Sequence, residues 1–489
     1  MHGQKKMETP SSWADCIKNN RPIRLDDTAD PSHVLETMRD TLLELSDMCH
    51  VARMLWIMGI VSQEAPVPVS SHLAGVINAV DIRQLPTALG TTWGCCTAAS
   101  QACVARILRT TPVSRPFPFP AIKEATTRAP VRIDLAGGWT DTPPIALEAD
   151  GAVVNAAILI DGACPICAKA ELRVSETPHI IMTERTWSGT VIRRVDSLAM
   201  FTDIRPSQPM AIVKAALLVS GVIRADDDAD LTTQIRASLP DPYNTLWVTS
   251  ECCLPTGTGL GVSSIVASAL LDAIARSRGT PYTSDVALVR DVLSLEQVIG
   301  CGGGWQDQIG GVIGGVKLTQ WGAGLRDDPF ITTLRGVGTR SVLKDMCLIY
   351  TGGQRISAKA VRTTVDGWHR RDDMITRTVS QLRHGAQEMA TALQSGDAAA
   401  VGTALSRYWE LKKNMVGVEA EPATFSATMA TIEARLHGWS LAGAGGGGYA
   451  VAVMRDDETI DSVKAGMRAT DPDALVVAFT CTDDGLLRE

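Results

Sequence analysis

Residues 254–264 read Leu-Pro-Thr-Gly-Thr-Gly-Leu-Gly-Val-Ser-Ser, and apolar residues then recur at helical spacing. This run predicts a glycine-rich turn that opens a helix. Backbone N–H groups approach an anion closely where Cβ atoms are missing, and a helix N-terminus adds a favourable dipole, so phosphate is the expected guest. No lysine follows the glycines as in a Walker A loop, and their spacing differs from G-x-G-x-x-G. If this run is considered alone, a capped helix after a flexible turn explains it about as well as a phosphate site does.

A second glycine-rich segment joins two acidic residues. Residues 293–299 have a helical pattern and run into Gly-Cys-Gly-Gly-Gly-Trp-Gln-Asp-Gln at 300–308. We expect Glu296 near a helix end and Asp307 on the loop. This arrangement can place one carboxylate on a hard cation and the other beside a substrate hydroxyl. Either acid alone would more often be a solvated surface residue.

Two further segments also combine glycines with a predicted turn next to a strand. Residues 130–144 read Pro-Val-Arg-Ile-Asp-Leu-Ala-Gly-Gly-Trp-Thr-Asp-Thr-Pro-Pro, which predicts a strand containing Arg132 and a turn containing Asp141. Residues 441–449 read Leu-Ala-Gly-Ala-Gly-Gly-Gly-Gly-Tyr, which predicts a turn with close backbone approach before a strand. Each segment is a weak signal by itself.

The rest of the chain predicts a helical start followed by a mixed α and β region. Apolar residues from Leu35 to Trp56 recur every three or four positions, as on one face of a helix, whereas prolines break the pattern between 112 and 120. Farther on, β-type and helical patterns alternate, with strands expected at 131–135, 153–160, 346–351 and 450–454 and helices between 357 and 415. The predicted divisions are a helical segment 1–110, a Pro-rich linker 111–125, a first lobe 126–322 and a second lobe 323–489.

Composition excludes several classes of protein. The 54 acidic residues outnumber 46 basic ones, giving a net charge of −8, so we expect no nucleic-acid partner. No apolar run approaches the ~18 residues of a membrane-spanning helix, and the start of the chain is polar, so we expect no membrane partner and a cytoplasmic location. The 12 cysteines are diluted in a long chain, which favours reduced thiols. The histidines lie too far apart for a zinc motif, so any metal is expected to have oxygen ligands.

Together and in this order, the four segments resemble the GHMP kinases, the superfamily of galactokinase and of homoserine, mevalonate and phosphomevalonate kinases, and specifically its L-fucose kinase branch. The resemblance covers about residues 126–489 and extends to tracts at 350–352, 408–413 and 440–444. It implies an α+β, two-lobed fold, with an N-lobe like ribosomal S5 domain 2 and a ferredoxin-like C-lobe. It also implies ATP and Mg²⁺ as cofactors, and phosphorylation of L-fucose to β-L-fucose 1-phosphate.

The resemblance also implies roles for individual residues. Asp307 is similar to the catalytic base and Arg132 to the residue beside base and phosphate, while Ser263 and Glu296 correspond to Mg²⁺ ligands. The residues implied in nucleotide binding are Pro255, Gly257, Thr258, Gly259, Leu260, Gly261, Val262, Ser263 and Ser264. The residues assigned to sugar binding are Asp141, Trp139, Gly304, Trp305, Gly445 and Gly446. For the two tryptophans the reason is chemical: their rings can offer an apolar face to the C6 methyl group of fucose, and packing in the core explains them about equally well.

Two features depart from the family. Val262 stands where the superfamily usually has Ser or Thr, so one hydroxyl facing the phosphates is missing. Fucokinases often have a large nucleotidyltransferase-like region before the kinase, whereas only about 110 residues precede the linker here, which predicts a chain with kinase activity only.

Three alternatives to a fucose kinase stay open. One is a kinase for a heptose phosphate, whose family shares the Gly-Gly-x-Thr-Asp and Gln-Asp-Gln cores. Against it stand the two tryptophans and the lack of Lys or Arg from 134 to 168 and from 291 to 316, with Arg355 the main exception. The others are a catalytically silent sugar sensor and a degraded protein whose residues 1–125 no longer pack on the kinase. The oligomeric state is not predicted.

Overall fold

The computed structural model describes residues 117–489 except 225–227, 256, 351–356, 418–419, 422 and 469–474, together with residues 38, 51–58 and 100. Of the helix predicted between Leu35 and Trp56, Met38 and residues 51–56 are described, and they are helical and buried. Most of the predicted segment 1–110, residues 111–116 of the linker and Arg355 lie outside the described residues.

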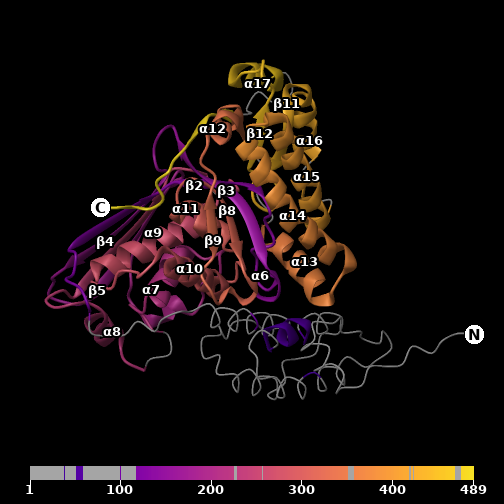
Figure 1. Cartoon of the computed structure of the whole chain (residues 1–489). Coiled ribbons are helices and arrows are strands. Elements are labelled where there is room, and N and C mark those ends of the chain that lie inside the picture. Colours follow the sequence, from indigo (N-terminus) through magenta and orange to yellow (C-terminus); the bar gives the residue numbers. More distant parts are fainter. Residues whose placement is uncertain are drawn as a thin grey trace, which may run out of the picture.

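One sheet forms the outer side of the first lobe. Its strand order is β15-β1-β4-β7-β5-β6 (Figure 1). The strands are β1 (Glu124–Ala129), β4 (Ile166–Arg173), β5 (His179–Thr186), β6 (Gly189–Arg194), β7 (Thr245–Cys252) and β15 (Leu487–Arg488). Buried and partly exposed residues alternate along β4, as expected for a sheet with one face on the core. Helix α9 (Val262–Ser277) packs against β1 and β4.

A second sheet lies at the centre of the molecule. Its order is β14-β3-β8-β9, and β2 pairs antiparallel with β3. The strands are β2 (Val131–Ala136), β3 (Gly151–Ile160), β8 (Val316–Trp321), β9 (Phe330–Thr333) and β14 (Phe479–Cys481). Every residue of β2 is buried, because helices of both lobes pack against this strand. Its two charged residues, Arg132 and Asp134, therefore need partners inside the protein.

Helices fill the space between these sheets and close the first lobe. Helix α9 contacts α7, α10 and α11, and α11 contacts β2 and β3. The first-lobe helices are α6 (Ile145–Glu148), α7 (Ala211–Val219), α8 (Leu231–Ser238), α10 (Asp285–Ile299) and α11 (Gln306–Val312).

The second lobe combines a sheet with long helices. The sheet order is β11-β12-β10-β13, antiparallel throughout. Its strands are β10 (Met346–Tyr350), β11 (Leu436–Leu441), β12 (Tyr449–Met454) and β13 (Leu475–Val477). The helices after β9 are α12 (Val337–Lys344), α13 (Ser357–Arg370), α14 (Asp373–Ser395), α15 (Ala398–Val416), α16 (Ala423–Ala430) and α17 (Ile460–Met467). Asp372 and Asp397 cap α14 and α15, which agrees with the predicted helical stretch.

The lobe boundary predicted at residue 322 does not match the strand pairing. β9 pairs with β8, while β14 and β15 near the end of the chain pair with β3 and β1. Pairing satisfies the backbone groups of first-lobe strands that would otherwise be exposed sheet edges. The range 323–489 therefore contains the second lobe and also strands of the first.

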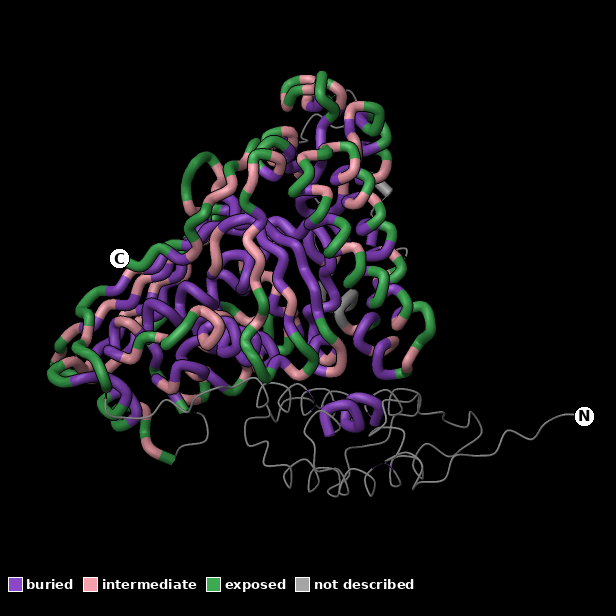
Figure 2. Tube along the Cα trace, in the orientation of Figure 1, coloured by how far each residue is buried: buried purple, intermediate pink, exposed green. Residues whose placement is uncertain are grey.

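Buried residues run continuously through the middle of both lobes (Figure 2). The cysteines of the described residues are free thiols. Among the helices that the structure describes, none is both long and apolar enough to cross a membrane.

Candidate active site

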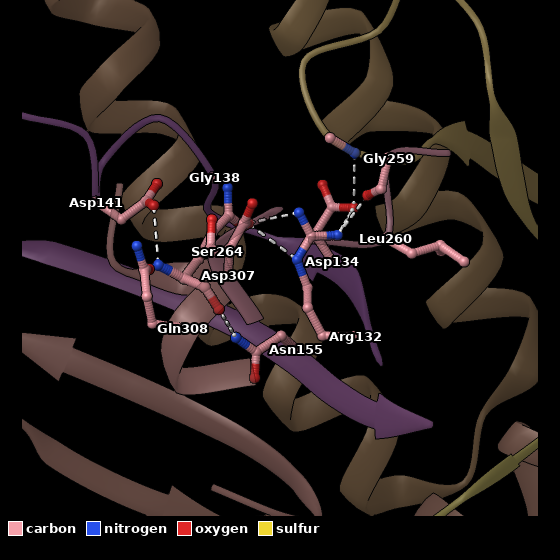
Figure 3. A network of polar contacts seen from close by, with 12 residues as sticks. Arg132, Asp134, Gly138, Asp141, Asn155, Gly259, Leu260, Ser264, Asp307 and Gln308 are labelled. Atoms are coloured by element: carbon pink, nitrogen blue, oxygen red, sulfur yellow. Dashed lines mark hydrogen bonds and ion pairs between the residues drawn. The ribbon is translucent and has the colours of Figure 1, made fainter. Parts of the chain in front are cut away.

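A buried arginine and a partly exposed aspartate form the centre of the site (Figure 3). Arg132 on β2 donates two hydrogen bonds to Oδ1 of Asp307, from Nε at 3.0 Å and from Nη2 at 2.5 Å. Its Nη1 donates to the carbonyl oxygen of Gly259 at 2.6 Å. The Arg132 side chain is 1% exposed and that of Asp307 is 17% exposed, so the carboxylate is open to a ligand while the guanidinium is fixed.

Glycines bring α11 close enough to β2 for this contact. A Cβ on Gly310 would lie 2.6 Å from Cβ of Arg132, and one on Gly311 would lie 2.6 Å from the side chain of Ile265. Asp307 was expected on a loop, but it lies in the first turn of α11. The close packing of Gly310 and Gly311 explains why a segment of low helix propensity is helical here.

The turn at 257–261 ends at the N-terminus of α9. Gly257, Gly259 and Gly261 all have φ between +72° and +79°, a conformation that strains other residues. No side chain caps α9, which begins directly after Gly261. A helix of 16 residues with an uncapped N-terminus and a glycine turn in front of it suits a phosphate group.

The other residues implied in nucleotide binding lie along the same turn. Thr258 and Leu260 are buried, whereas Pro255 and Val262 are partly exposed. Ser263, in the first turn of α9, is exposed.

The glycine turn of the second lobe lies directly against this turn. The Tyr449 backbone N–H donates to the Thr258 carbonyl at 3.0 Å. A Cβ on Gly448 would lie 2.6 Å from the Gly257 carbonyl oxygen. The predicted sugar residues Gly445 and Gly446 face the second lobe instead: Gly446 N–H donates to the Ala420 carbonyl at 2.7 Å. Their close contacts are thus with protein.

Asp141 is buried beside α11, in the turn after β2. Its Oδ2 accepts a hydrogen bond from the Gln306 backbone N–H at 3.1 Å, while its buried Oδ1 has no partner in the structure. Burial raises the pKa of Asp141 to about 7, and the charge of Asp307 adds to the effect. Gly304 also contacts this carboxylate and leaves no room there for a side chain. Asp141 thus offers an acceptor oxygen to a bound hydroxyl.

Glu296, near the end of α10, is buried and faces the start of α9. It accepts hydrogen bonds from Nε2 of Gln308 at 3.0 Å and from the Ser264 hydroxyl. Burial raises the pKa of Glu296 to about 8, and the charges of Asp307 and Asp141 add to the effect. The structure thus brings Glu296 to Ser264, whereas Ser263, the serine implied as a Mg²⁺ ligand, lies on another face of the helix.

The donor set fits a hard cation. No group of three His, Cys, Asp or Glu side chains within the described residues is arranged to hold a metal by itself. However, the charge of Asp307 helps to raise the carboxyl pKa values of both Glu296 and Asp141, so three carboxyl groups lie near one another. Carboxylate and hydroxyl oxygens are the ligands that Mg²⁺ prefers, with substrate phosphates completing its shell.

The two tryptophans predicted to contact sugar are core residues. Trp305 is 0% exposed and packs against Trp321, with ring centroids 5.8 Å apart. Trp139 is 5% exposed and belongs to the same hydrophobic core. A preference for a deoxy-sugar therefore cannot rest on these rings.

Sequence reasoning missed three residues that the structure joins to the site. Asp134 on β2 accepts hydrogen bonds from the Tyr408 hydroxyl at 3.0 Å and from Nζ of Lys412 at 3.3 Å, both on α15. A charged residue two positions after Arg132 in a buried strand was an available signal. Tyr408 and Lys412, four residues apart, share one helix face, but no local pattern shows that this face meets β2.

Comparisons with known proteins support the same family. Residues 230–315 match the GHMP kinases N terminal domain. The chain is 33% identical over 363 residues to an L-fucokinase/L-fucose-1-P guanylyltransferase of Bacteroides fragilis, which covers 73% of this chain and 38% of that protein. It is 29% identical over 340 residues to a bifunctional fucokinase/GDP-fucose pyrophosphorylase of Arabidopsis thaliana, covering 67% of this chain and 30% of that protein. The chain thus matches about a third of the length of these relatives.

Solved structures share the fold. A D-glycero-D-manno-heptose 1-phosphate kinase from Bacteroides thetaiotaomicron aligns with a TM-score of 0.52 and 19% identity, covering 75% of this chain and 98% of that one. A Lactococcus lactis galactokinase complexed with galactose aligns with a TM-score of 0.51 and 15% identity, covering 75% and 95%. The family match includes the glycine turn, Glu296 and Asp307, and the fold likeness extends over both lobes. The chain belongs to the GHMP kinase superfamily.

Proposed function

We propose that this protein is an ATP-dependent sugar kinase that phosphorylates L-fucose to β-L-fucose 1-phosphate. The observation that carries the proposal is the Arg132–Asp307 pair, which lies beside the uncapped start of α9. A carboxylate, a fixed cation and an uncapped helix N-terminus thus lie side by side, which supports the proposal. Phosphoryl transfer needs such positioning and charge neutralisation more than covalent help.

Asp307 is the proposed base. Its partly exposed carboxylate accepts or orients the proton of the attacking sugar hydroxyl. Arg132 holds this carboxylate and neutralises negative charge on the transferring phosphoryl group. Because the guanidinium is buried and has several partners, it keeps its position when the substrate binds.

The nucleotide phosphates are assigned to the turn at 257–261 and the first turn of α9. Backbone N–H groups there have no side-chain cap. Val262 provides no hydroxyl to this surface, so the backbone and Ser263 provide the polar contacts.

The family resemblance makes Ser263 and Glu296 the proposed ligands of Mg²⁺, although the serine that contacts Glu296 in the structure is Ser264. The ion would neutralise charge on the phosphate groups when bound. Ser264 and Gln308 hold the Glu296 carboxylate by hydrogen bonds and so fix its orientation.

The sugar site is assigned to the region around Asp141. Buried acceptor oxygens of Asp141, Asn155 and Gln306 have no donor in the structure. The Asn155 amide also donates to the Gln306 carbonyl at 3.0 Å, so these residues form one cluster. Sugar hydroxyls are donors that satisfy such acceptors, whereas a phosphate at neutral pH offers mainly acceptors and negative charge. The cluster therefore favours a free sugar.

The choice of L-fucose rests on the relatives. Both curated relatives are named for fucokinase activity together with a second activity. The likeness to a heptose phosphate kinase, at 19% identity, shows the fold alone. A silent sugar sensor would not need Arg132, Asp307, Glu296 and Ser263 together. A cytosolic setting, where ATP is available and thiols stay reduced, suits this activity.

A sugar panel tests the proposal. ADP release is measured with Mg-ATP and, in turn, L-fucose, D-galactose, a heptose and a heptose phosphate. We expect the highest kcat/KM with L-fucose. A higher kcat/KM with the heptose phosphate would show that L-fucose is not the preferred substrate, while the protein would still be a sugar kinase. No ADP release with any sugar would show that the protein is not a sugar kinase.

A further inference from the structure

Four buried or partly buried charges of alternating sign connect the second lobe to the proposed base. Lys412 lies 3.3 Å from Asp134, Asp134 lies 3.5 Å from Arg132, and Arg132 lies 2.5 Å from Asp307. The side chains of Lys412, Asp134 and Arg132 are each at most 1% exposed. Isolated charges at such depth are costly, so each one depends on its neighbours.

Asp134 is the carboxylate that contacts both buried cations, Lys412 and Arg132. Burial alone would raise its pKa, but the charges of Lys412 and Arg132 and a hydrogen bond from the Gly443 backbone hold the pKa below its ordinary value. Asp134 and Arg132 stand two residues apart on one face of β2. Without Lys412, two carboxylates would share one guanidinium, and Asp134 would compete with Asp307 for Arg132.

The face of α15 that carries Tyr408 and Lys412 also contacts two turns of the site, the second-lobe glycine turn and the turn that carries Asp141. Nζ of Lys412 donates to the carbonyls of Leu441 and Gly443, where the second-lobe glycine turn starts. The Tyr408 hydroxyl accepts a hydrogen bond from the Gly138 backbone N–H at 3.1 Å, at the start of the turn that carries Asp141. A Cβ on Gly138 would overlap this hydroxyl.

We propose that Lys412, assisted by Tyr408, is a positioning residue: acting from α15 through Asp134, it keeps the Arg132 guanidinium on Asp307. This inference rests on the proposed kinase activity. Neither residue touches the reacting groups directly. Their effect is on the rate of phosphoryl transfer and much less on nucleotide binding, because the nucleotide contacts come from the backbone of 257–261 and from α9.

The first test compares Lys412→Met with Lys413→Met. Lys413 is the next residue of α15, is partly exposed and pairs with Glu410 and Glu421, so its variant controls for loss of a lysine from this helix. We expect kcat of Lys412→Met to fall ~100-fold, as for a displaced catalytic group, with KM for ATP within about threefold of wild type. Lys413→Met should retain wild-type kcat.

Two further variants separate positioning from simple stability. Tyr408→Phe removes only a hydroxyl and should also lower kcat. This variant tests the proposal even if Lys412→Met fails to fold. Combining Lys412→Met with Asp134→Asn removes one charge of each sign, so this double variant should recover about tenfold in kcat over Lys412→Met, within the range of coupling between contacting residues.

Distinct results would overturn this inference and the proposed function. A wild-type enzyme that phosphorylates sugar, with kcat unchanged in Lys412→Met or in Tyr408→Phe, overturns the positioning role alone. Equal losses of kcat and nucleotide affinity, together with no recovery in the double variant, would show a merely structural role and also overturn it. A wild-type protein that releases no ADP with any sugar defeats the proposed function first.

Discussion

Gly304 and Asp141 are in contact so close that a side chain on the glycine would overlap the Asp141 carboxylate. The backbone N–H of Gln306 donates to the same carboxylate oxygen at 3.1 Å. The segment 304–306 therefore wraps around Asp141 and leaves its other oxygen buried and without a partner. This relationship explains why glycine stands at 304, although its φ is not in the left-handed region.

Replacing Gly304 with alanine should damage sugar recognition. The added methyl group must displace Asp141, and a displacement near 1 Å can cost ~100-fold in rate. We expect kcat/KM for the sugar to fall by about that factor, with nucleotide affinity kept. Gly322→Ala is the matched control, because a Cβ there meets nothing within 4 Å. Equal kinetics of the two variants would remove Asp141 from the sugar site.

Replacing Asp307 with asparagine should separate catalysis from binding. Asparagine keeps the shape of the side chain but cannot act as a base, which typically costs ~100-fold or more in turnover. Titration calorimetry with a nonhydrolysable ATP analogue should show little change in affinity, since the nucleotide contacts lie on α9 and its turn. An unchanged kcat would exclude Asp307 from the mechanism.

Features set by local sequence could be predicted, and those set by distant packing could not. The strand with Arg132, the turn with Asp141 and the glycine turn before α9 follow from residue types within about ten positions. By contrast, residues 306–312 include two glycines that disfavour a helix, and only packing on Arg132 and Ile265 makes them helical.

The contacts of charged groups show the same limit. Lys412 and Asp134 are 278 residues apart in sequence, and no local pattern joins them. Adjacent residues on a helix point about 100° apart, so the sequence alone could not tell whether Ser263 or Ser264 meets Glu296. The return of β14 and β15 to the first lobe is likewise a result of strand pairing at a distance.

Three substitutions should locate the metal ligands. Glu296→Gln keeps the side-chain shape but loses an anionic ligand of a hard cation, so we expect a higher Mg²⁺ concentration for half-maximal rate. Ser263→Ala should shift the Mg²⁺ titration in the same direction if this exposed serine is a ligand. Ser264→Ala removes a hydrogen bond to Glu296 and should mainly lower stability. If the Mg²⁺ titration shifts in Ser264→Ala but not in Ser263→Ala, the metal ligand is Ser264 and not Ser263.

A buried lysine in contact with α11 predicts how the free energy of unfolding depends on pH. Lys317 on β8 is 0% exposed, and its Nζ donates to the carbonyls of Gly310 at 3.4 Å and Gly315 at 3.1 Å. Gly310 belongs to α11, the helix that carries Asp307. Burial disfavours the charged amine and lowers the pKa of Lys317 to about 7.

The free energy of unfolding should therefore rise with pH above neutrality because of Lys317. An unfolded lysine keeps its proton up to its ordinary pKa of ~10.4. Between about pH 7 and that value the unfolded chain binds one more proton than the native one, so raising the pH favours the native state. Lys317→Met abolishes this difference, whatever its effect on absolute stability. Urea unfolding midpoints from about pH 7 to about pH 9.5 should thus rise for wild type relative to Lys317→Met. The exposed Lys169→Met serves as control, and parallel curves for wild type and Lys317→Met would show that Lys317 is protonated in the native protein throughout.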